Sequence, residues 1–250
     1  MAAPPVVEIE RRAREATAWP RGTAVAVALA AAATVGAGAL LGGWLELPGV
    51  VLRAVALAGS GGAIFLWLAV RRLRSSRFGV ANAVTLVRAA LAVLLAALVG
   101  AAPSATLGWV VVGLGTAGVA LDGVDGPLAR RRNESGTFGA RFDMETDALL
   151  ILVLAALVWQ QGKAGAWILA AGLLRYLFVA ASWVLPWMGA ALPPSRRRQA
   201  VCVVQIVSLL AALAPVVART WSAGLALFGL AALVWSFAVD VRWLARQARA

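Results

Sequence analysis

The chain has 250 residues, 62% of them hydrophobic, and a mean hydropathy of +0.86, which is too apolar for an ordinary soluble domain. It contains no histidine, which excludes histidine-based catalysis and metal ligation, and its single cysteine, Cys202, excludes an intrachain disulfide. The net charge of +12 does not indicate a nucleic-acid partner, because the arginines cluster at the ends of apolar runs, as topology signals and anionic-lipid contacts do.

The first 77 residues predict a tail and two membrane helices. Residues 1–22 carry four arginines among small and acidic residues and are expected to form a cytoplasmic tail. Apolar runs at about 23–43 and 50–70 predict two transmembrane helices joined by a turn at Pro48. The length of the first run, and the lack of a convincing cleavage site, favour a retained helix over a signal peptide. The basic stretch RRLRSSR closes this 23–77 region.

Six further apolar segments follow in residues 78–250, and the breaks between them contain Pro, Gly or charged residues. The predicted spans are 80–102, 104–122, 139–160, 165–187, 199–218 and 222–243. The turn at Pro103 is short, so the helices on either side of it are expected to be antiparallel neighbours. The fold class is therefore predicted to be all-α, a polytopic integral membrane helix bundle with eight spans and both termini on one side.

Basic residues are distributed unevenly between the two predicted sides of the membrane. If the N-terminus is cytoplasmic, eighteen basic residues lie on the inner side and only Arg53, Lys163 and Arg219 on the outer side. Tryptophans mark both interfaces, with Trp167 among the outer ones and Trp187 among the inner ones. This bias follows the positive-inside rule and predicts that the loop between the fourth and fifth spans faces the cytoplasm.

That loop lies within an acidic stretch from Asp122 to Asp147, which holds six of the eleven acidic residues. Asp122 and Asp125 are three residues apart, and Asp143 and Asp147 are four apart, so each pair lies on one helix face. Two such pairs across a short loop can hold hard divalent cations, because Mg²⁺ takes carboxylate and phosphate oxygens. The alternative is a solvated acidic loop between helices.

The stretch also matches the pattern D-x2-D-G-x2-A-R-x8-G-x3-D-x3-D, and the positions that fill it are Asp122, Asp125, Gly126, Ala129, Arg130, Gly139, Asp143 and Asp147. Through this pattern the chain resembles the CDP-alcohol phosphotransferases (CDP-alcohol phosphatidyltransferases), integral membrane enzymes that make phospholipids. The resemblance covers about residues 78–245. It implies a six-helix core, here residues 78–250, to which the two N-terminal transmembrane helices are additional. It also implies a homodimer in a bacterial-type cell membrane.

The resemblance implies transfer of a phosphatidyl or other substituted phosphate group to an alcohol acceptor, with release of CMP. The donor is CDP-diacylglycerol or another CDP-alcohol. In the family scheme, Asp122, Asp125 and Asp143 chiefly hold two Mg²⁺ or Mn²⁺ ions. Asp147 is then the general base that takes the acceptor's proton, and it also touches a metal.

Donor contacts are expected from small and polar residues of the pattern and of the segment ANAVTLVR, which resembles the start of the family's first core helix. Gly126 and Gly139 lack a Cβ and so allow close approach of the nucleotide, and Arg130 can make a bidentate contact with the diphosphate. Ala129 is a donor-binding candidate from its position in the pattern. Helix packing is the alternative for the glycines. Asn82 and Thr85, three residues apart, are donor-binding candidates, with helix capping or interface polarity as the alternative. Arg88 lies deeper in the predicted span and is expected to need a carboxylate or phosphate partner.

Candidates for contacts with the acceptor or the lipid lie in the second half of the chain. Arg175 is predicted near mid-helix, where a lone charge is costly, so it has either a substrate role or a structural pairing with Glu46 or Asp240. The basic segment at the start of the seventh span, with a glutamine two turns on, resembles the family's acceptor side; its residues are Arg196, Arg197, Arg198 and Gln205. A positive-inside cluster is the alternative for the arginines.

Two other function classes use acidic residues in membranes. An intramembrane prenyltransferase also uses Asp-rich motifs with Mg²⁺ and diphosphate, but its motifs lie far apart in sequence. A cation transporter would expect carboxylates nearer the bilayer middle. Nothing in the sequence identifies the acceptor alcohol.

Overall fold

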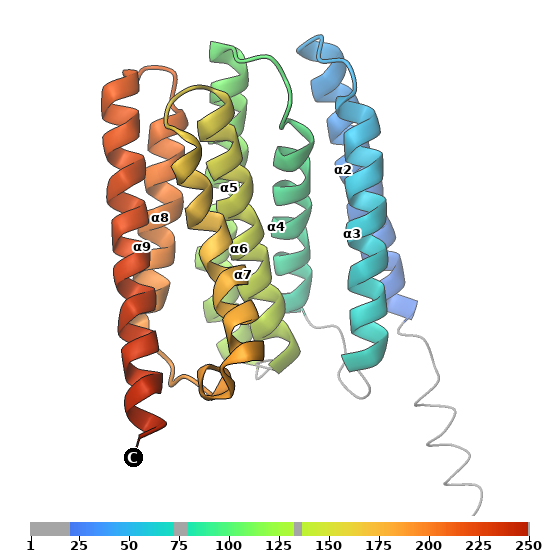
Figure 1. Cartoon of the computed structure of the whole chain (residues 1–250). Coiled ribbons are helices and arrows are strands. Elements are labelled where there is room, and N and C mark those ends of the chain that lie inside the picture. Colours follow the sequence, from blue (N-terminus) through green and yellow to red (C-terminus); the bar gives the residue numbers. More distant parts are fainter. Residues whose placement is uncertain (1–20, 73–79, 133–136, 250) are drawn as a thin grey trace, which may run out of the picture.

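The computed structural model describes residues 21–72, 80–132 and 137–249, and for residues 21, 69–72, 80–81, 124–132 and 137–138 it describes the backbone alone. Within these ranges the chain forms a bundle of eight α-helices and two short 3-10 helices, without strands (Figure 1). The elements are α2 (Arg21–Trp44), α3 (Val50–Arg72), α4 (Val80–Ala97), α5 (Ala105–Arg132), α6 (Thr137–Gln160), η1 (Ala166–Ile168), α7 (Leu169–Val184), η2 (Pro186–Gly189), α8 (Arg196–Leu213) and α9 (Arg219–Gln247). The predicted all-α fold class is confirmed.

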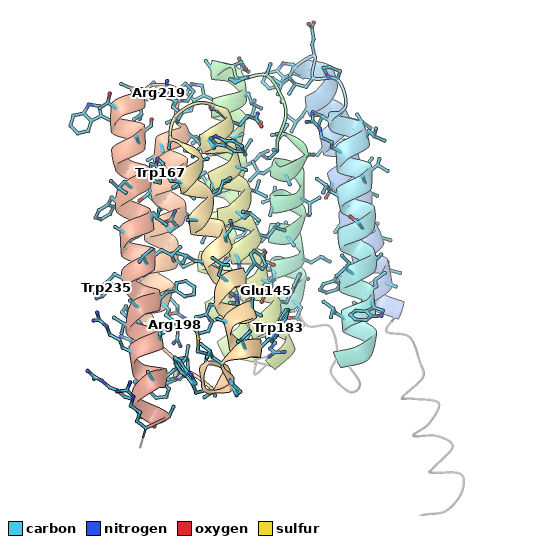
Figure 2. The ribbon with its side chains drawn as sticks, in the orientation of Figure 1. Glu145, Trp167, Trp183, Arg198, Arg219 and Trp235 are labelled. Atoms are coloured by element: carbon cyan, nitrogen blue, oxygen red, sulfur yellow. The ribbon has the colours of Figure 1, made fainter. Side chains whose placement is uncertain are left out.

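The helices run alternately up and down, so that α2 begins and α9 ends at the same end of the bundle, the lower end in Figure 1. Trp167 and Arg219 lie near the upper end, and Trp183 and Arg198 lie near the lower end (Figure 2). This arrangement agrees with the predicted placement of both termini on one side.

Helix α6 lies at the centre of the packing, because it contacts α4, α7 and α8. Its side chains Leu154 and Leu157 are fully buried in one apolar core with Leu95 of α4, Leu107 of α5 and Leu209 of α8. Helices α2 and α3 pack on each other and on α4, at the edge of the bundle. The lower turns of α4, α5 and α6 are therefore held side by side by the core above them.

The upper end of α6 is terminated by a glycine C-cap at Gly162. Gly162 has a φ of +66°, and its N–H donates to the Trp159 carbonyl while the Lys163 N–H donates to the Val158 carbonyl. This is the Schellman arrangement, which favours glycine at the left-handed position. The Lys163 ammonium then donates to the Val217 carbonyl at 2.6 Å, which ties this turn to the α8–α9 connection.

Within the described residues, five of the eight helices are long and apolar enough to cross a membrane. They lie at residues Gly22–Trp44, Val50–Leu68, Ala105–Gly123, Ala166–Val184 and Arg219–Gln247. The apolar part of α4 is shorter, at Asn82–Ala97. Exposed apolar side chains such as Leu40 and Leu29 cover the outer faces, as expected of helices whose solvent is lipid. The chain is a multi-pass membrane protein.

Two predicted spans end too late. The third was expected to reach residue 102, but α4 ends at Ala97, and the seventh was expected to reach residue 218, but α8 ends at Leu213. The fourth span, predicted to end at about residue 122, agrees with the apolar span Ala105–Gly123, although α5 itself continues to Arg132, past Pro127. Hydropathy locates where an apolar run stops, whereas a helix continues as long as its backbone hydrogen bonds do, so a polar extension leaves no hydropathy signal. The expected tail, residues 1–22, lies outside the described residues up to residue 20, as does the 73–79 part of the basic linker.

Candidate metal and active site

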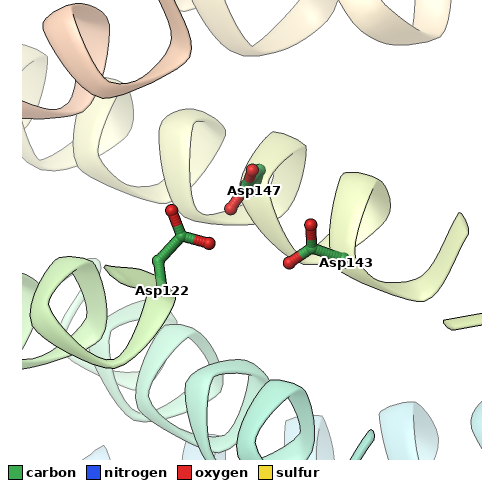
Figure 3. Close-up of side chains that lie close together, drawn as sticks. All are labelled: Asp122, Asp143 and Asp147. Carbon is green, nitrogen blue, oxygen red and sulfur yellow. The ribbon is translucent and has the colours of Figure 1, made fainter. Parts of the chain in front are cut away.

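Three of the four predicted carboxylates converge at the lower end of the bundle. Asp122 comes from α5, and Asp143 and Asp147 come from α6, where they are one turn apart. One carboxyl oxygen from each of the three lies within 4.8 Å of the others. Figure 3 shows the three carboxyl groups pointing toward one another across the gap between the two helices. The spacing of the motif builds this cluster together with α4 and α8, each of which packs against both α5 and α6.

A buried arginine joins the three carboxylates from the neighbouring helix α4. The Nη1 atom of Arg88 lies 2.8 Å from Asp122 Oδ1 and 2.5 Å from Asp143 Oδ1. Its Nη2 atom lies 2.5 Å from Asp147 Oδ1. The Arg88 side chain is only 3% exposed, so the pairs are strong electrostatic contacts in a region of low dielectric constant. The predicted need of Arg88 for a carboxylate or phosphate partner is confirmed.

The surroundings of Asp147 differ from those of the other two carboxylates. Its side chain is 21% exposed, against 32% for Asp122 and 42% for Asp143. Its second oxygen, Oδ2, lies 3.5 Å from the Cys202 sulfur of α8, which donates to it. Asp147 is therefore the most buried of the three carboxylates, and α8 contacts it through Cys202.

The two predicted donor-binding residues of α4 lie one and two turns below Arg88. Asn82 packs against Gly139 of α6, since a Cβ added at Gly139 would lie 2.7 Å from the Asn82 Oδ1 atom. A larger residue at position 139 would have to displace the Asn82 amide. Thr85 is buried between Asn82 and Arg88 on the same side of the helix. Gly139 thus has a packing role here, whatever further role it has toward a nucleotide.

The side chains of Asp125, Gly126, Ala129 and Arg130 lie outside the described residues, which give only their backbone as part of α5. On a continuous helix, Asp125 lies one turn beyond Asp122 on the same face.

The predicted acceptor-side arginines form a second charged centre at the lower end of the bundle. Arg197 of α8 donates to Asp240 of α9 at 2.5 Å and to the Ser236 hydroxyl at 2.5 Å. Arg198 also reaches Asp240, at 3.4 Å. Arg196 is exposed. The arginines therefore do not join the carboxylate cluster, but fasten α8 to α9 around one aspartate.

Gln205 lies deeper along α8 than this centre and is fully buried. Its amide packs on Gly229 of α9, where a Cβ would lie 2.8 Å from the Gln205 Oε1 atom. Neither polar atom of the amide has a hydrogen-bond partner among the described residues. The structure thus brings Gln205 to the α8–α9 contact and not to the carboxylates.

Arg175 pairs with Glu145 of α6, with 2.7 Å between Nη2 and Oε1. The predicted structural partners, Glu46 and Asp240, are wrong, because Glu46 lies in the turn at the upper end of the bundle and Asp240 is taken by Arg197 and Arg198. Glu145 lies between Asp143 and Asp147 in sequence but points to another face of α6. Arg175 therefore contacts the motif helix from its far side.

The residues present fit a divalent cation. All three groups are carboxylates, which are the hard oxygen donors that Mg²⁺ and Mn²⁺ prefer. Among the side chains that the structure describes, three carboxylates face a single guanidinium, which leaves two negative charges in excess. A divalent cation would neutralise this excess.

The fold and this centre define a class, namely multi-pass membrane proteins with a carboxylate cluster at one end of a helix bundle. The family model for CDP-alcohol phosphatidyltransferase matches residues 78–239, which is more than half of the chain and runs from α4 into α9. The chain therefore belongs to the CDP-alcohol phosphatidyltransferase family, whose members transfer a phosphatidyl group from a CDP-alcohol. No curated protein and no solved structure matches the chain. Helices α2 and α3 lie outside the matched region.

Sequence reasoning did not identify the contacts of three residues on or beside the motif helices. It predicted that Arg88 needs a carboxylate or phosphate, because a lone charge inside an apolar segment is costly, but it did not predict which carboxylates. Glu145 could have been linked with Arg175 only by knowing that α6 and α7 are neighbours. Cys202 carried no signal at all.

Proposed function

We propose that this protein is a metal-dependent transferase of phospholipid biosynthesis. It moves a phosphatidyl or other substituted phosphate group from a CDP-linked donor to the hydroxyl of an alcohol, with release of CMP. The observation that carries the proposal is the convergence of Asp122, Asp143 and Asp147 from α5 and α6 within the domain that the family model matches.

Asp122, Asp125 and Asp143 would hold two Mg²⁺ or Mn²⁺ ions. When bound, these ions supply charge neutralisation at the donor's diphosphate and at the leaving CMP. These carboxylates lie one turn apart on α5 and α6, so the helices themselves hold them in position. No loop has to become ordered to form the site.

Asp147 would take the proton of the acceptor hydroxyl. It is the least exposed of the three described carboxylates, so the solvent competes least for it. A carboxylate within reach of the acceptor hydroxyl can act as its general base.

Donor binding would fall to the lower turns of the same helices. Asn82 and Thr85 line α4 below Arg88, and Gly139 keeps α6 close to them. Gly126, Ala129 and Arg130 follow Asp125 on α5, where Arg130 would contact the diphosphate in bidentate fashion.

Acceptor or lipid contacts would come from the centre on α8 and α9 and from Arg175. One aspartate is shared there by Arg197 and Arg198, so a positive charge remains to attract an anionic acceptor or headgroup. Arg196 is exposed beside them. Gln205 has unused hydrogen-bonding capacity deeper on α8.

We place the site on the cytoplasmic side of a bacterial-type cell membrane, in a homodimer. The support for this orientation is the excess of basic residues on the side of the bundle where α2 begins and α9 ends. In right-side-out vesicles, terminal tags should be protected, and a Lys163→Cys probe in a Cys202→Ala background should be labelled from outside. Labelling of a terminal tag would reverse this orientation.

The proposed reaction is tested by incubating purified protein with CDP-diacylglycerol, Mg²⁺ and a panel of alcohols that includes inositol phosphate, glycerol phosphate and serine. Mass spectrometry of the lipid extract should show one new phosphatidyl product, whose mass names the acceptor. A panel extended to soluble CDP-alcohols with diacylglycerol tests the alternative donor class. Absence of any transfer product across both panels would refute the proposal.

A further inference from the structure

Arg88 contacts the same carboxyl groups that the proposed metal site needs. Its Nη1 atom bridges Asp122 and Asp143 across the gap between α5 and α6, and its Nη2 atom holds Asp147. No position of the family pattern contains this arginine. It comes from α4, six residues after Asn82 and three after Thr85.

The contact distances of 2.5 to 2.8 Å place the guanidinium directly on the Oδ1 atoms of the three carboxylates. A divalent cation would bind such oxygens at about 2.0–2.1 Å. Two positive groups so close to one oxygen repel each other strongly where the dielectric constant is low. The same oxygens therefore cannot fully contact the Arg88 guanidinium and fully ligate a cation at the same time.

We propose that Arg88 and divalent cations compete for the carboxyl oxygens of Asp122, Asp143 and Asp147. Arg88 yields these oxygens to the cations, and its released guanidinium then pairs with the diphosphate of the donor. Its planar fork of N–H donors matches phosphate oxygens as well as it matches carboxylates. The second half of the proposal rests on the proposed function, whereas the competition itself does not.

The geometry of α4 allows the Arg88 side chain to turn from the carboxylates toward the proposed donor site. Side chains on a helix lean toward its N-terminus, so Arg88 leans toward Thr85 and Asn82. Asn82 lies about 9 Å below Arg88 along the axis, which is six residues at 1.5 Å each. The arginine therefore needs only a change of rotamer, and no helix movement, to face a diphosphate held near these two residues.

The charge count supports the exchange as well. Among the described side chains, three carboxylates exceed one guanidinium by two charges, so the cluster attracts a divalent cation even while Arg88 is present. Once cations bind these carboxylates, the cations and the guanidinium together carry positive charge in excess. The diphosphate supplies negative charge to balance this excess, so metal and donor should each strengthen the binding of the other.

The test measures Mn²⁺ affinity by electron paramagnetic resonance, in detergent and without donor, for the wild type, Arg88→Gln and Arg88→Lys. Removal of the competing charge should tighten Mn²⁺ binding by about tenfold or more in Arg88→Gln, the range expected when charged hydrogen bonds are removed. Arg88→Lys keeps a charge but loses the fork, so its affinity should lie between the two. Unchanged or weaker Mn²⁺ binding in Arg88→Gln overturns the proposal and assigns Arg88 to holding the helices together.

Arg197→Gln is the matched control, because Arg197 is also an ion-paired arginine at the lower end of the bundle but pairs with Asp240. Its Mn²⁺ affinity should stay within about twofold of the wild type, since Arg197 pairs with Asp240 and Ser236 and with none of the three carboxylates. An equal gain in both variants would show an effect of net charge alone and would overturn the competition. If Arg88→Gln does not fold, Arg88→Lys carries the same test, with a gain expected and no gain contradictory.

A second arm uses CDP as the probe of the diphosphate site. Mn²⁺ should increase the CDP affinity of the wild type, and this enhancement should be smaller by about tenfold in Arg88→Gln, because the released guanidinium is missing. An equal enhancement in both proteins overturns the exchange. If the wild type transfers no phosphatidyl group in the panel assay while Arg88→Gln still gains Mn²⁺ affinity, the proposed function fails and the competition stands.

Discussion

The lower end of the bundle holds two clusters of ion-paired side chains with opposite ratios of acidic to basic residues. In the first, one arginine of α4 is shared by three aspartates of α5 and α6. In the second, one aspartate of α9 is shared by two arginines of α8. Counting the described side chains alone, the first centre keeps two negative charges in excess, and the second keeps one positive charge.

This difference indicates what each centre can bind. Ion pairs that serve only to join helices tend to be balanced, because unpaired buried charge is costly. An excess of one charge therefore suggests a site where a bound ion of the opposite charge restores neutrality. The carboxylate centre calls for cations, and the arginine centre calls for an anion such as a phosphate. A reaction between a metal-bound diphosphate and an anionic acceptor would use both.

The largest expected effect comes from removing the cations of the first centre. Thorough treatment with EDTA should abolish turnover, and added Mg²⁺ or Mn²⁺ should restore it, because the carboxylates alone would repel the donor's diphosphate. The measurement is CMP release before and after the metal is returned. Full activity in the chelated enzyme would show that the carboxylate cluster does not need a metal for turnover.

The next largest effect should come from Asp147→Asn. If Asp147 is the base, turnover falls by about 10²–10⁴, the usual contribution of general-base catalysis. Donor binding should persist, since Asp122, Asp125 and Asp143 keep most of the metal ligation. Asp125→Asn is the matched variant, and it should weaken donor or Mn²⁺ binding together with turnover.

Calorimetric titration of the donor beside product formation separates the two roles. A loss of donor binding in Asp147→Asn as complete as in Asp125→Asn would make Asp147 chiefly a ligand. Near-normal turnover in Asp147→Asn would remove it from the mechanism.

A smaller effect is expected at the second centre, on stability more than on chemistry. Asp240→Asn leaves Arg197 and Arg198 without their shared partner, and it should lower the free energy of unfolding by about 1–3 kcal/mol. Thermal unfolding in detergent measures the change. Arg196→Gln, on the exposed side of the same turn, should lie within about 0.5 kcal/mol of the wild type. Equal stability of Asp240→Asn and wild type would mean that the centre does not hold α8 to α9.

The smallest effect is expected for Cys202→Ala, which removes the sulfur that touches Asp147. A thiol is a weak donor, and the contact is 3.5 Å long, so turnover should change by no more than about fivefold. Steady-state CMP release checks this. A loss as large as that of Asp147→Asn would show that Cys202 orients the base.

The sequence was sufficient to predict much of the first centre and little of the second. Asp122, Asp143 and Asp147 could be grouped because their spacings are helical and only a short loop separates the two helices. The pairing of Arg197 with Asp240 depends on α8 and α9 meeting side by side, 43 residues apart in sequence, and no local spacing encodes that contact. The same limit applies to Arg88, whose need for a partner was evident but whose three partners were not.

Helix ends show a second physical limit of the sequence. The apolar runs predicted eight helices correctly, because lipid-facing and core-facing residues are both apolar over long stretches. The continuation of α5 to Arg132 was missed because its last turns are polar and contain a proline, two features that usually end a helix.

The central claim is that the carboxylate centre serves transfer from a CDP-linked donor, and the nucleotide product tests it most directly. Purified protein, CDP-diacylglycerol, Mg²⁺ and the accepting alcohol should yield CMP in a one-to-one ratio with the new lipid, resolved by chromatography of the reaction mixture. Release of pyrophosphate from a prenyl diphosphate would instead indicate a prenyltransferase. Metal flux in liposomes without any nucleotide turnover would contradict the claim and assign the acidic cluster to cation transport.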